Sequence, residues 1–154
     1  MLSPRFFVLA GLFTFCATGA CGSEKTVPDH ITAQIAPAKT SIYIGSVTLT
    51  VAPLTRQGAS YASTYTASVF PYFFFTEAGT FQIEVSDADL FRLASGQSID
   101  FTGLAVRADG VVRPLACHAD PHSLADGRVK VRVYVSKRLI LVFNTTYHIS
   151  GWQN

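Results

Sequence analysis

The densest group of reactive side chains in this 154-residue chain is the segment Cys117-His118-Ala119-Asp120-Pro121-His122. A thiolate and two imidazoles suit zinc or copper, because both ions accept sulfur and nitrogen ligands. Cys117 and His118 are adjacent, so in a strand they would point to opposite faces. Only a turn at Asp120-Pro121 would bring either of them to His122. We therefore treat Cys117, His118 and His122 as an alternative metal site, and a solvated hairpin loop as the simpler interpretation.

Cys117 also raises the questions of a nucleophile and of a disulfide. A catalytic thiolate needs a base within hydrogen-bond reach, and adjacent residues such as Cys117 and His118 seldom reach that geometry. A disulfide between Cys21 and Cys117 can form only if the Cys21 thiol is not lipidated. The sequence contains no G-x-S-x-G, HExxH or CxxC pattern and no phosphate-binding glycine loop. We therefore expect no enzymatic activity.

A second group of side chains is basic. Arg128, Lys130 and Arg132 alternate along one expected strand, and Lys137 and Arg138 follow it. Alternate residues on one strand face lie ~6.5–7 Å apart. This spacing suits an anionic polymer, a lipid headgroup or an acidic partner. Residues 77–100 carry five acidic side chains and one arginine, so charge pairing across the sheet, or a plain solvated face, is the alternative.

A third group is aromatic, because the run Phe70-Pro71-Tyr72-Phe73-Phe74-Phe75 contains five aromatic residues in six positions. In a strand, Phe73 and Phe75 would point one way, and Tyr72 and Phe74 the other. One core layer cannot take all of them. We therefore predict an exposed part that contacts an apolar ligand, a partner protein or a membrane surface. A core that spans two layers is the alternative.

The first 20 residues are typical of an export signal. Arg5 precedes an apolar run of about 12 residues from Phe6 to Ala17, which is shorter than the ~20 residues that a transmembrane helix needs. The following Thr18-Gly19-Ala20-Cys21 resembles the lipobox of bacterial lipoproteins, with Thr18 in place of the usual leucine. The resemblance implies that Cys21 is lipidated and becomes the N-terminus. Thr18 and Ala20 also fit an ordinary small-x-small cleavage site.

Composition excludes several classes of protein. A net charge of +2, with 14% charged residues, gives no global field that would hold nucleic acid. A hydrophobic fraction of 49% excludes disorder for the bulk of the chain. Three cysteines are too few for a disulfide scaffold.

Strand patterns dominate the rest of the chain, and one helix interrupts them. Alternation of apolar and polar residues predicts strands at 41–52, 61–70, 80–85, 98–108, 111–118, 128–135 and 139–149. Tyr43 should point inward from the first of these strands. Pro114 favours an edge strand, and the apolar start of the last strand suggests that both its faces are covered. Residues 86–95 should form a helix that Ser86 or Asp87 caps and Gly96 ends.

These elements predict an all-β domain, either an antiparallel sandwich or a partly closed barrel of seven or eight strands. We divide the chain into a signal peptide (1–20), a lipidated N-terminus and tether (21–40) and a single β domain (41–154). For residues 30–40, an edge strand broken by Pro37 is an equal alternative.

We expect an exported, lipid-anchored domain that faces the periplasm and binds or scaffolds without catalysis. Gly22 after Cys21 favours the outer membrane, as the lipoprotein resemblance implies. The expected partners are the membrane through the anchor, and an envelope protein or an anionic or apolar ligand. We expect no nucleic acid and no cofactor, unless Cys117, His118 and His122 hold zinc or copper.

Overall fold

The computed structural model describes residues 30–152, apart from the side chain of Phe73. Its strands are β1 (Thr32–Ile35), β2 (Ala38–Ile42), β3 (Gly45–Val51), β4 (Leu54–Gln57), β5 (Ser60–Phe70), β6 (Glu77–Glu84), β7 (Ile99–Arg107), β8 (Val112–Pro121), β9 (Asp126–Ser136) and β10 (Leu139–Ser150). Helix α1 (Asp87–Ala94) joins β6 to β7, and a 3-10 turn (Phe73–Phe75) precedes β6. The all-β prediction is confirmed.

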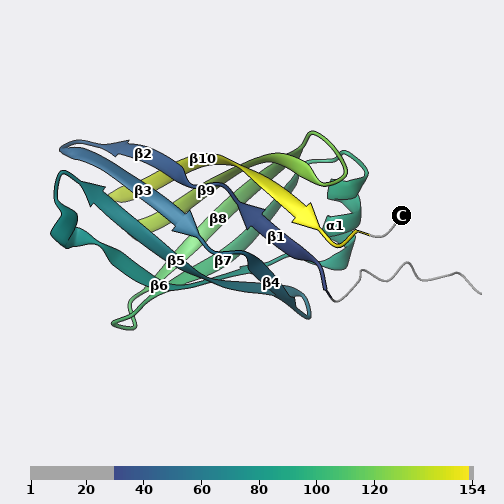
Figure 1. The fold of residues 1–154 in the computed structure, drawn as a ribbon, viewed down its shortest axis with the longest axis horizontal. Helices are drawn as coiled ribbons and strands as arrows, with labels where there is room; N and C mark the ends of the chain where they lie inside the picture. Colours follow the sequence, from purple (N-terminus) through teal and green to yellow (C-terminus); the bar gives the residue numbers. More distant parts are fainter. Residues whose placement is uncertain (1–29, 153–154) are drawn as a thin grey trace, which may run out of the picture.

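The antiparallel sheet closes on itself as an eight-stranded barrel (Figure 1). Going round the wall, the strands follow the order β4, β1, β10, β9, β8, β7, β6 and β5, and β5 pairs back with β4. The ring closes where Thr32 of β1 pairs with Ser150 of β10. Of the two architectures that the sequence left open, the barrel is the one observed.

Two prolines break the first two segments of the wall. Pro37 separates β1 from β2, and Pro53 separates β3 from β4, because proline has no amide hydrogen for the ladder. The residue before each proline still donates its backbone N–H to the neighbouring strand, at 3.0 Å and 2.9 Å. The strands β2 and β3 therefore extend the wall beyond β1 and β4. For residues 30–40, the structure shows strands on both sides of Pro37, but β1 is not the expected edge strand, because it pairs with both β4 and β10.

Alternating side chains fill the barrel interior, as the period of two predicts. In β9, Val129, Val131 and Val133 are buried, whereas Arg128 and Lys130 face outward. The largest fully buried side chains are those of Phe81, Phe143, Ile31, Leu54 and Val131. The middle of the barrel is therefore a packed core.

Helix α1 lies across one end of the barrel, and it begins and ends as predicted. The Ser86 hydroxyl accepts the backbone N–H of Asp89 at 3.1 Å, and Gly96 takes a positive φ of 81° after the last turn. Leu90 and Leu93 are buried against the barrel interior. Within residues 30–152, no helix has the length and apolar character needed to cross a membrane.

Three expectations from the sequence are wrong. Residues 41–52 do not form one strand, because a hairpin turns at Tyr43 and leaves that side chain fully exposed. The outer face of early β10 is uncovered, since Ile140 and Val142 are exposed and the one described helix lies at the barrel end. Pro114 marks no edge, because β8 pairs with both β7 and β9; it lies just before Leu115, where the pairing with β9 begins.

Candidate ligand-binding site at the barrel mouth

The structure does not bring the three candidate metal ligands together. Cys117 is 3% exposed and faces the interior, whereas His118 lies outside with its Nδ1 at 2.7 Å from Asp100 Oδ1. That hydrogen bond raises the pKa of His118 above its ordinary value. His122 lies in the turn after β8 and donates its backbone N–H to Asp126. Among residues 30–152, no three His, Cys, Asp or Glu side chains are placed to hold a metal ion.

The Cys117 thiol is an ordinary buried core group in this structure. Burial raises its pKa to about 12, so the thiolate that a nucleophile or a metal ligand requires is disfavoured. Cys21 lies outside the described residues. Its predicted lipidation, and its pairing with Cys117, therefore stay predictions.

The basic residues Arg128, Lys130 and Arg132 alternate along the outer face of β9, and all three are exposed. They form no ion pair within the described part of the chain. The acidic residues of 77–100 that could have paired with them have nearer partners: Glu77 bonds Arg113, Asp87 bonds Arg56, Asp89 bonds Arg92 and Asp100 bonds His118. The cross-sheet pairing that the sequence left open is therefore not observed for these residues.

The aromatic segment forms a turn between β5 and β6, and most of it is exposed. Phe74 is 78% exposed and Phe75 is 62% exposed, with their ring centroids 4.9 Å apart. The predicted contribution of the Phe73 side chain lies outside the described residues. The segment is not a strand, so the alternation expected for it does not apply.

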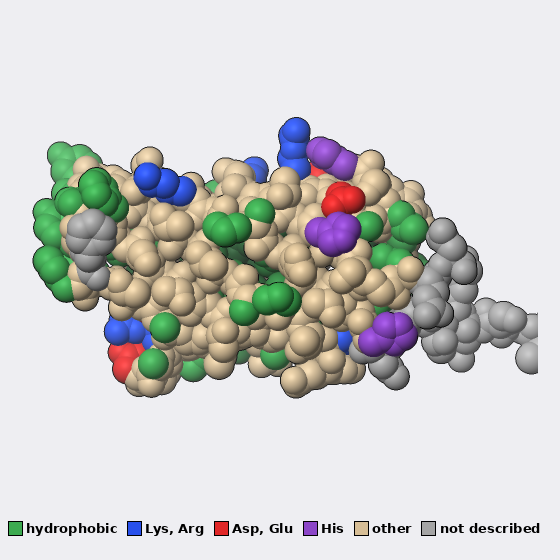
Figure 2. Space-filling view, viewed as in Figure 1, with side chains coloured by type: hydrophobic (Ala, Val, Ile, Leu, Met, Phe, Trp, Pro, Cys, Tyr) green, Lys and Arg blue, Asp and Glu red, His purple; other side chains and the backbone are tan. Residues whose placement is uncertain are grey.

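Other exposed hydrophobic side chains lie at the same end of the barrel, opposite α1 (Figures 1 and 2). They come from the β2–β3, β5–β6 and β9–β10 hairpin tips. We call this set the aromatic rim: Tyr43, Ile44, Phe70, Tyr72, Phe74, Phe75, Leu139 and Ile140. An exposed apolar group of this kind is uncommon on a soluble surface unless it contacts something.

An open cavity of about 380 Å³, which we call the mouth, is lined by three residues of the aromatic rim, Phe74, Phe75 and Leu139. Its walls are mostly apolar, and they are contributed by Ile42, Val47, Ala67, Val69, Val135, Leu139 and Leu141. Phe74 and Phe75 line it from the rim, and the charged side chains of Glu77, Arg107 and Arg113 also line it. A smaller cavity of about 30 Å³ lies deeper and shares Glu77 and Arg113 with the mouth. Val47, Ala67 and Leu141 are shared as well. We call the place where Glu77 and Arg113 line both cavities, with Arg107 beside them, the floor of the mouth.

Hydrogen bonds and ion pairs hold these polar groups in one cluster. Glu77 Oε1 accepts the Tyr65 hydroxyl at 2.7 Å and Arg113 Nη1 at 2.8 Å. Arg107 Nε lies 3.7 Å from Glu77 Oε2, and its Nη2 lies 2.9 Å from Asp109 on the β7–β8 turn. Burial and the bond to Glu77 raise the pKa of Tyr65 well above its ordinary value, so the phenol keeps its proton and donates.

The cluster leaves one buried donor without an acceptor. Arg113 Nε is inaccessible to solvent and has no hydrogen-bond partner in the structure. Unsatisfied buried polar atoms of this kind are rare and destabilising. The Nη2 of the same guanidinium also has no partner among the described residues but is accessible to solvent, so Nη2 is the donor that Arg113 offers to the mouth.

Sequence reasoning did not identify this cluster, although a signal for it was present. Glu77, Arg107 and Arg113 occupy inward positions of β6, β7 and β8, in phase with Phe81, Ala105 and Leu115. A charged residue in phase with the buried face is unusual, because burying a charge costs free energy unless it is paired. Three such residues at the same end of three consecutive strands would have indicated a polar site.

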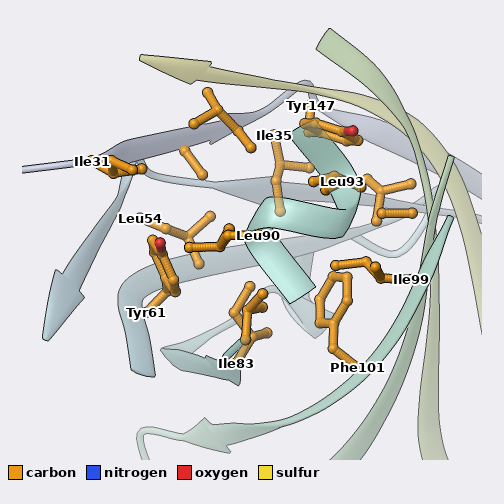
Figure 3. A pocket seen from close by; sticks show the side chains of 15 residues that line it. Ile31, Ile35, Leu54, Tyr61, Ile83, Leu90, Leu93, Ile99, Phe101 and Tyr147 are labelled. Atoms are coloured by element: carbon orange, nitrogen blue, oxygen red, sulfur yellow. The ribbon is translucent and has the colours of Figure 1, made fainter. Parts of the chain in front are cut away.

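A separate cavity lies between α1 and the barrel wall (Figure 3). Its volume is about 60 Å³, and apolar side chains including Leu54, Leu90 and Ile99 line it. The hydroxyl groups of Tyr61 and Tyr147, two other lining residues, are buried without a partner. An engineered cavity of ~150 Å³ is the size that binds benzene, so this space is too small for such a ligand. We regard it as imperfect packing beneath the helix.

Fold and site together define a closed antiparallel β-barrel that α1 covers at one end and that opens at the other into an apolar mouth with a charged floor. No family model, curated protein or solved structure matches the chain. The function is therefore argued from the barrel itself.

Proposed function

We propose that this chain is a non-enzymatic binding protein of the bacterial cell envelope that holds an apolar small molecule in the mouth of its barrel. The mouth carries this proposal. Its volume of about 380 Å³ lies within the roughly 300–1,000 Å³ of small-molecule sites, which combine apolar walls with a few placed polar groups. An eight-stranded barrel has an interior just wide enough for side chains or for one small ligand.

The binding test uses N-phenyl-1-naphthylamine, a neutral fluorescent probe whose emission rises in apolar surroundings. We expect saturable binding to the full-length chain. Leu141→Trp, which places a larger side chain in the mouth wall, should weaken binding about tenfold or more, because the probe then loses its space. Leu124→Trp is the matched control, since Leu124 is exposed in the β8–β9 turn and lies outside the mouth.

Two results would refute the binding proposal. One is the absence of saturable probe binding to a folded wild-type chain. The other is equal binding by the Leu141→Trp and Leu124→Trp variants, with circular dichroism that shows both to be folded. Either result would mean that the mouth is not the site.

The proposed location depends on the N-terminal signal and on Cys21. Export with lipidation would attach the chain to a membrane through Cys21, and Gly22 favours the outer membrane. β1 starts at the α1 end of the barrel (Figure 1), so the anchored side of the domain would be the α1 end. The mouth would then face away from the anchoring membrane and remain open to the periplasm.

Mass spectrometry of the protein from bacterial membranes tests the location. We expect a diacylglyceryl group on Cys21 and loss of membrane attachment in Cys21→Ala. A soluble chain with an unmodified Cys21 would contradict lipidation. That outcome leaves the binding proposal standing, because the mouth involves no residue before Ile42.

A further inference from the structure

We infer that the mouth selects amphipathic molecules with a carboxylate headgroup, of the fatty-acid type, and that Arg113 recognises this headgroup. The inference rests on the proposed function, because it names the chemical class of the ligand at the same site. Four features of the mouth support it: the balance of charge, the unused donors, the shape of the acceptor and the order of polar and apolar surfaces.

The balance of charge at the floor favours an anion. Two guanidinium groups, Arg107 and Arg113, face one carboxylate, Glu77, while Asp109 lies on the exposed hairpin tip beside Arg107. Glu77 and Arg113 are largely shielded from water, with side chains 15% and 16% exposed. Charges in such a place are screened less than on the surface. A second carboxylate near Arg113 would bring the floor closer to neutrality.

The donors at the floor are mostly unused. A guanidinium has five N–H donors, and within the described residues Arg113 bonds a protein acceptor through Nη1 alone. The Nη2 group has no partner among these residues and, unlike Nε, is accessible to solvent, so it is the donor that a ligand oxygen in the mouth can reach. Hydrogen bonds to charged groups are worth more than bonds between neutral groups, so an anionic oxygen at Nη2 gains more than a neutral one.

A carboxylate suits this donor better than a hydroxyl does. Guanidinium and carboxylate are both planar, and they form short charge-assisted hydrogen bonds. Glu77 already shows this chemistry at the floor, where its Oε1 accepts both Arg113 and Tyr65. An alcohol of the same chain length brings one neutral acceptor and leaves the charge of the floor unchanged.

The order of surfaces fixes how such a ligand lies. Glu77 and Arg113 line both the mouth and the smaller, deeper cavity, whereas Val69 and Val135 line the mouth alone. Phe74 and Phe75 also line the mouth alone, and both are exposed at its rim. Below the floor, the fully buried side chains of Phe81 and Phe143 fill the barrel. A headgroup at Arg113 therefore leaves the acyl chain running outward along the walls towards the aromatic rim.

The experiment compares decanoate with decanol, which share a chain and differ in the headgroup. Each competes with N-phenyl-1-naphthylamine for the full-length chain at pH 8. We expect decanoate to bind at least about tenfold more tightly than decanol, as one charge-assisted hydrogen bond would give. Arg113→Gln should reduce this ratio to near one. Arg128→Gln, which removes an equal charge from the outer face of β9, should keep it.

Glu77→Gln should raise the ratio of decanoate to decanol affinity, whereas Arg113→Gln should lower it. Removing the competing carboxylate frees both arginines for the ligand, so the ratio of decanoate to decanol affinity should rise by several-fold. A merely damaged site would weaken both ligands and would not raise the ratio. This variant therefore keeps the inference testable even if Arg113→Gln fails to fold.

The outcomes separate the two proposals. Equal affinity for decanoate and decanol, with the neutral probe still bound, would overturn the carboxylate inference and leave the binding proposal intact. A ratio that falls in Glu77→Gln would overturn it as well. Loss of all three ligands in a folded wild-type chain would instead remove the proposed function itself.

Discussion

At the scale of single residues, the floor of the mouth holds the most unusual chemistry in the molecule. Tyr65 and Arg113 share one oxygen of Glu77, and the Nε of Arg113 faces no acceptor. Buried ion pairs of this kind add little net stability, because desolvation offsets most of their attraction. Their retention in a barrel otherwise filled by apolar side chains is better explained by binding than by stability.

The Tyr65 hydroxyl should contribute only modestly to folding. Tyr65→Phe removes one donor from Glu77 but leaves Arg113 in place, so we expect a loss of about 1 kcal/mol of unfolding free energy. Tyr134→Phe is the control, because Tyr134 is exposed on the outer face of β9; its effect should be near zero. Urea denaturation of both variants checks this, and equal losses would show that the hydroxyl does not act through Glu77.

His118 should make stability depend on pH. The hydrogen bond to Asp100 raises its pKa in the folded state above the unfolded value, so its contribution is complete below pH ~6.5 and is lost as the pH rises through the folded pKa. The unfolding free energies of wild type and His118→Gln should therefore differ more at pH ~5.5 than at pH ~8.5. Asp100→Asn should reduce this dependence, and Asp120, whose Oδ1 lies 3.2 Å from His118 Nε2, should preserve part of it; an unchanged profile in Asp100→Asn would contradict the assigned cause.

Cys117 should resist thiol reagents while the barrel is folded. Its pKa of about 12 and its burial leave little thiolate and no access. We expect iodoacetamide to label Cys117 at least ~100-fold more slowly in the native chain than in urea. Peptide mass spectrometry distinguishes it from Cys16 and Cys21. Rapid native labelling would mean that the wall around β8 opens readily.

At the scale of elements, local signals specified α1 and β9 well. The cap at Ser86, the glycine at position 96 and the apolar pair Leu90 and Leu93 lie within one short segment, so the sequence alone predicted the helix. The hairpin at Tyr43 was missed because its neighbours are apolar or β-branched. Gly45, directly after the turn, allows β3 to approach β5 closely, because an added Cβ would lie 1.9 Å from the Phe70 carbonyl oxygen.

The capping bond should stabilise α1 measurably. Ser86→Ala removes the acceptor for the Asp89 N–H and should lower the unfolding free energy by about 1 kcal/mol. Ser95→Ala is the matched change at the other end of the helix, where the hydroxyl bonds the Phe91 carbonyl oxygen and caps no N–H; we expect under about 0.5 kcal/mol for it. Thermal unfolding that ranks the two variants in reverse order would contradict the assigned cap.

At the scale of the whole molecule, closure of the barrel was beyond the reach of local patterns. The contact that closes the ring joins Thr32 to Ser150, at opposite ends of the described chain, and nothing in either segment specifies that partner. The contacts within the site could not be predicted for the same reason. Tyr65, Glu77 and Arg113 are far apart in the sequence and meet only after β5 to β8 have paired. For the aromatic segment, exposure was one of two interpretations that the sequence left open. For the charged floor, inward phase marks Glu77, Arg107 and Arg113 one by one, but their contacts depend on the strand pairing.

The central claim is that the mouth, and neither the outer face of β9 nor the space under α1, holds the ligand. Nuclear magnetic resonance of the isotopically labelled full-length chain, titrated with decanoate, tests it most directly. We predict saturable shifts at Val69, Val135, Leu139 and Leu141 around the mouth. Saturable shifts confined to Leu90 and Leu93 beneath α1, or to Arg128, Lys130 and Arg132, would contradict it.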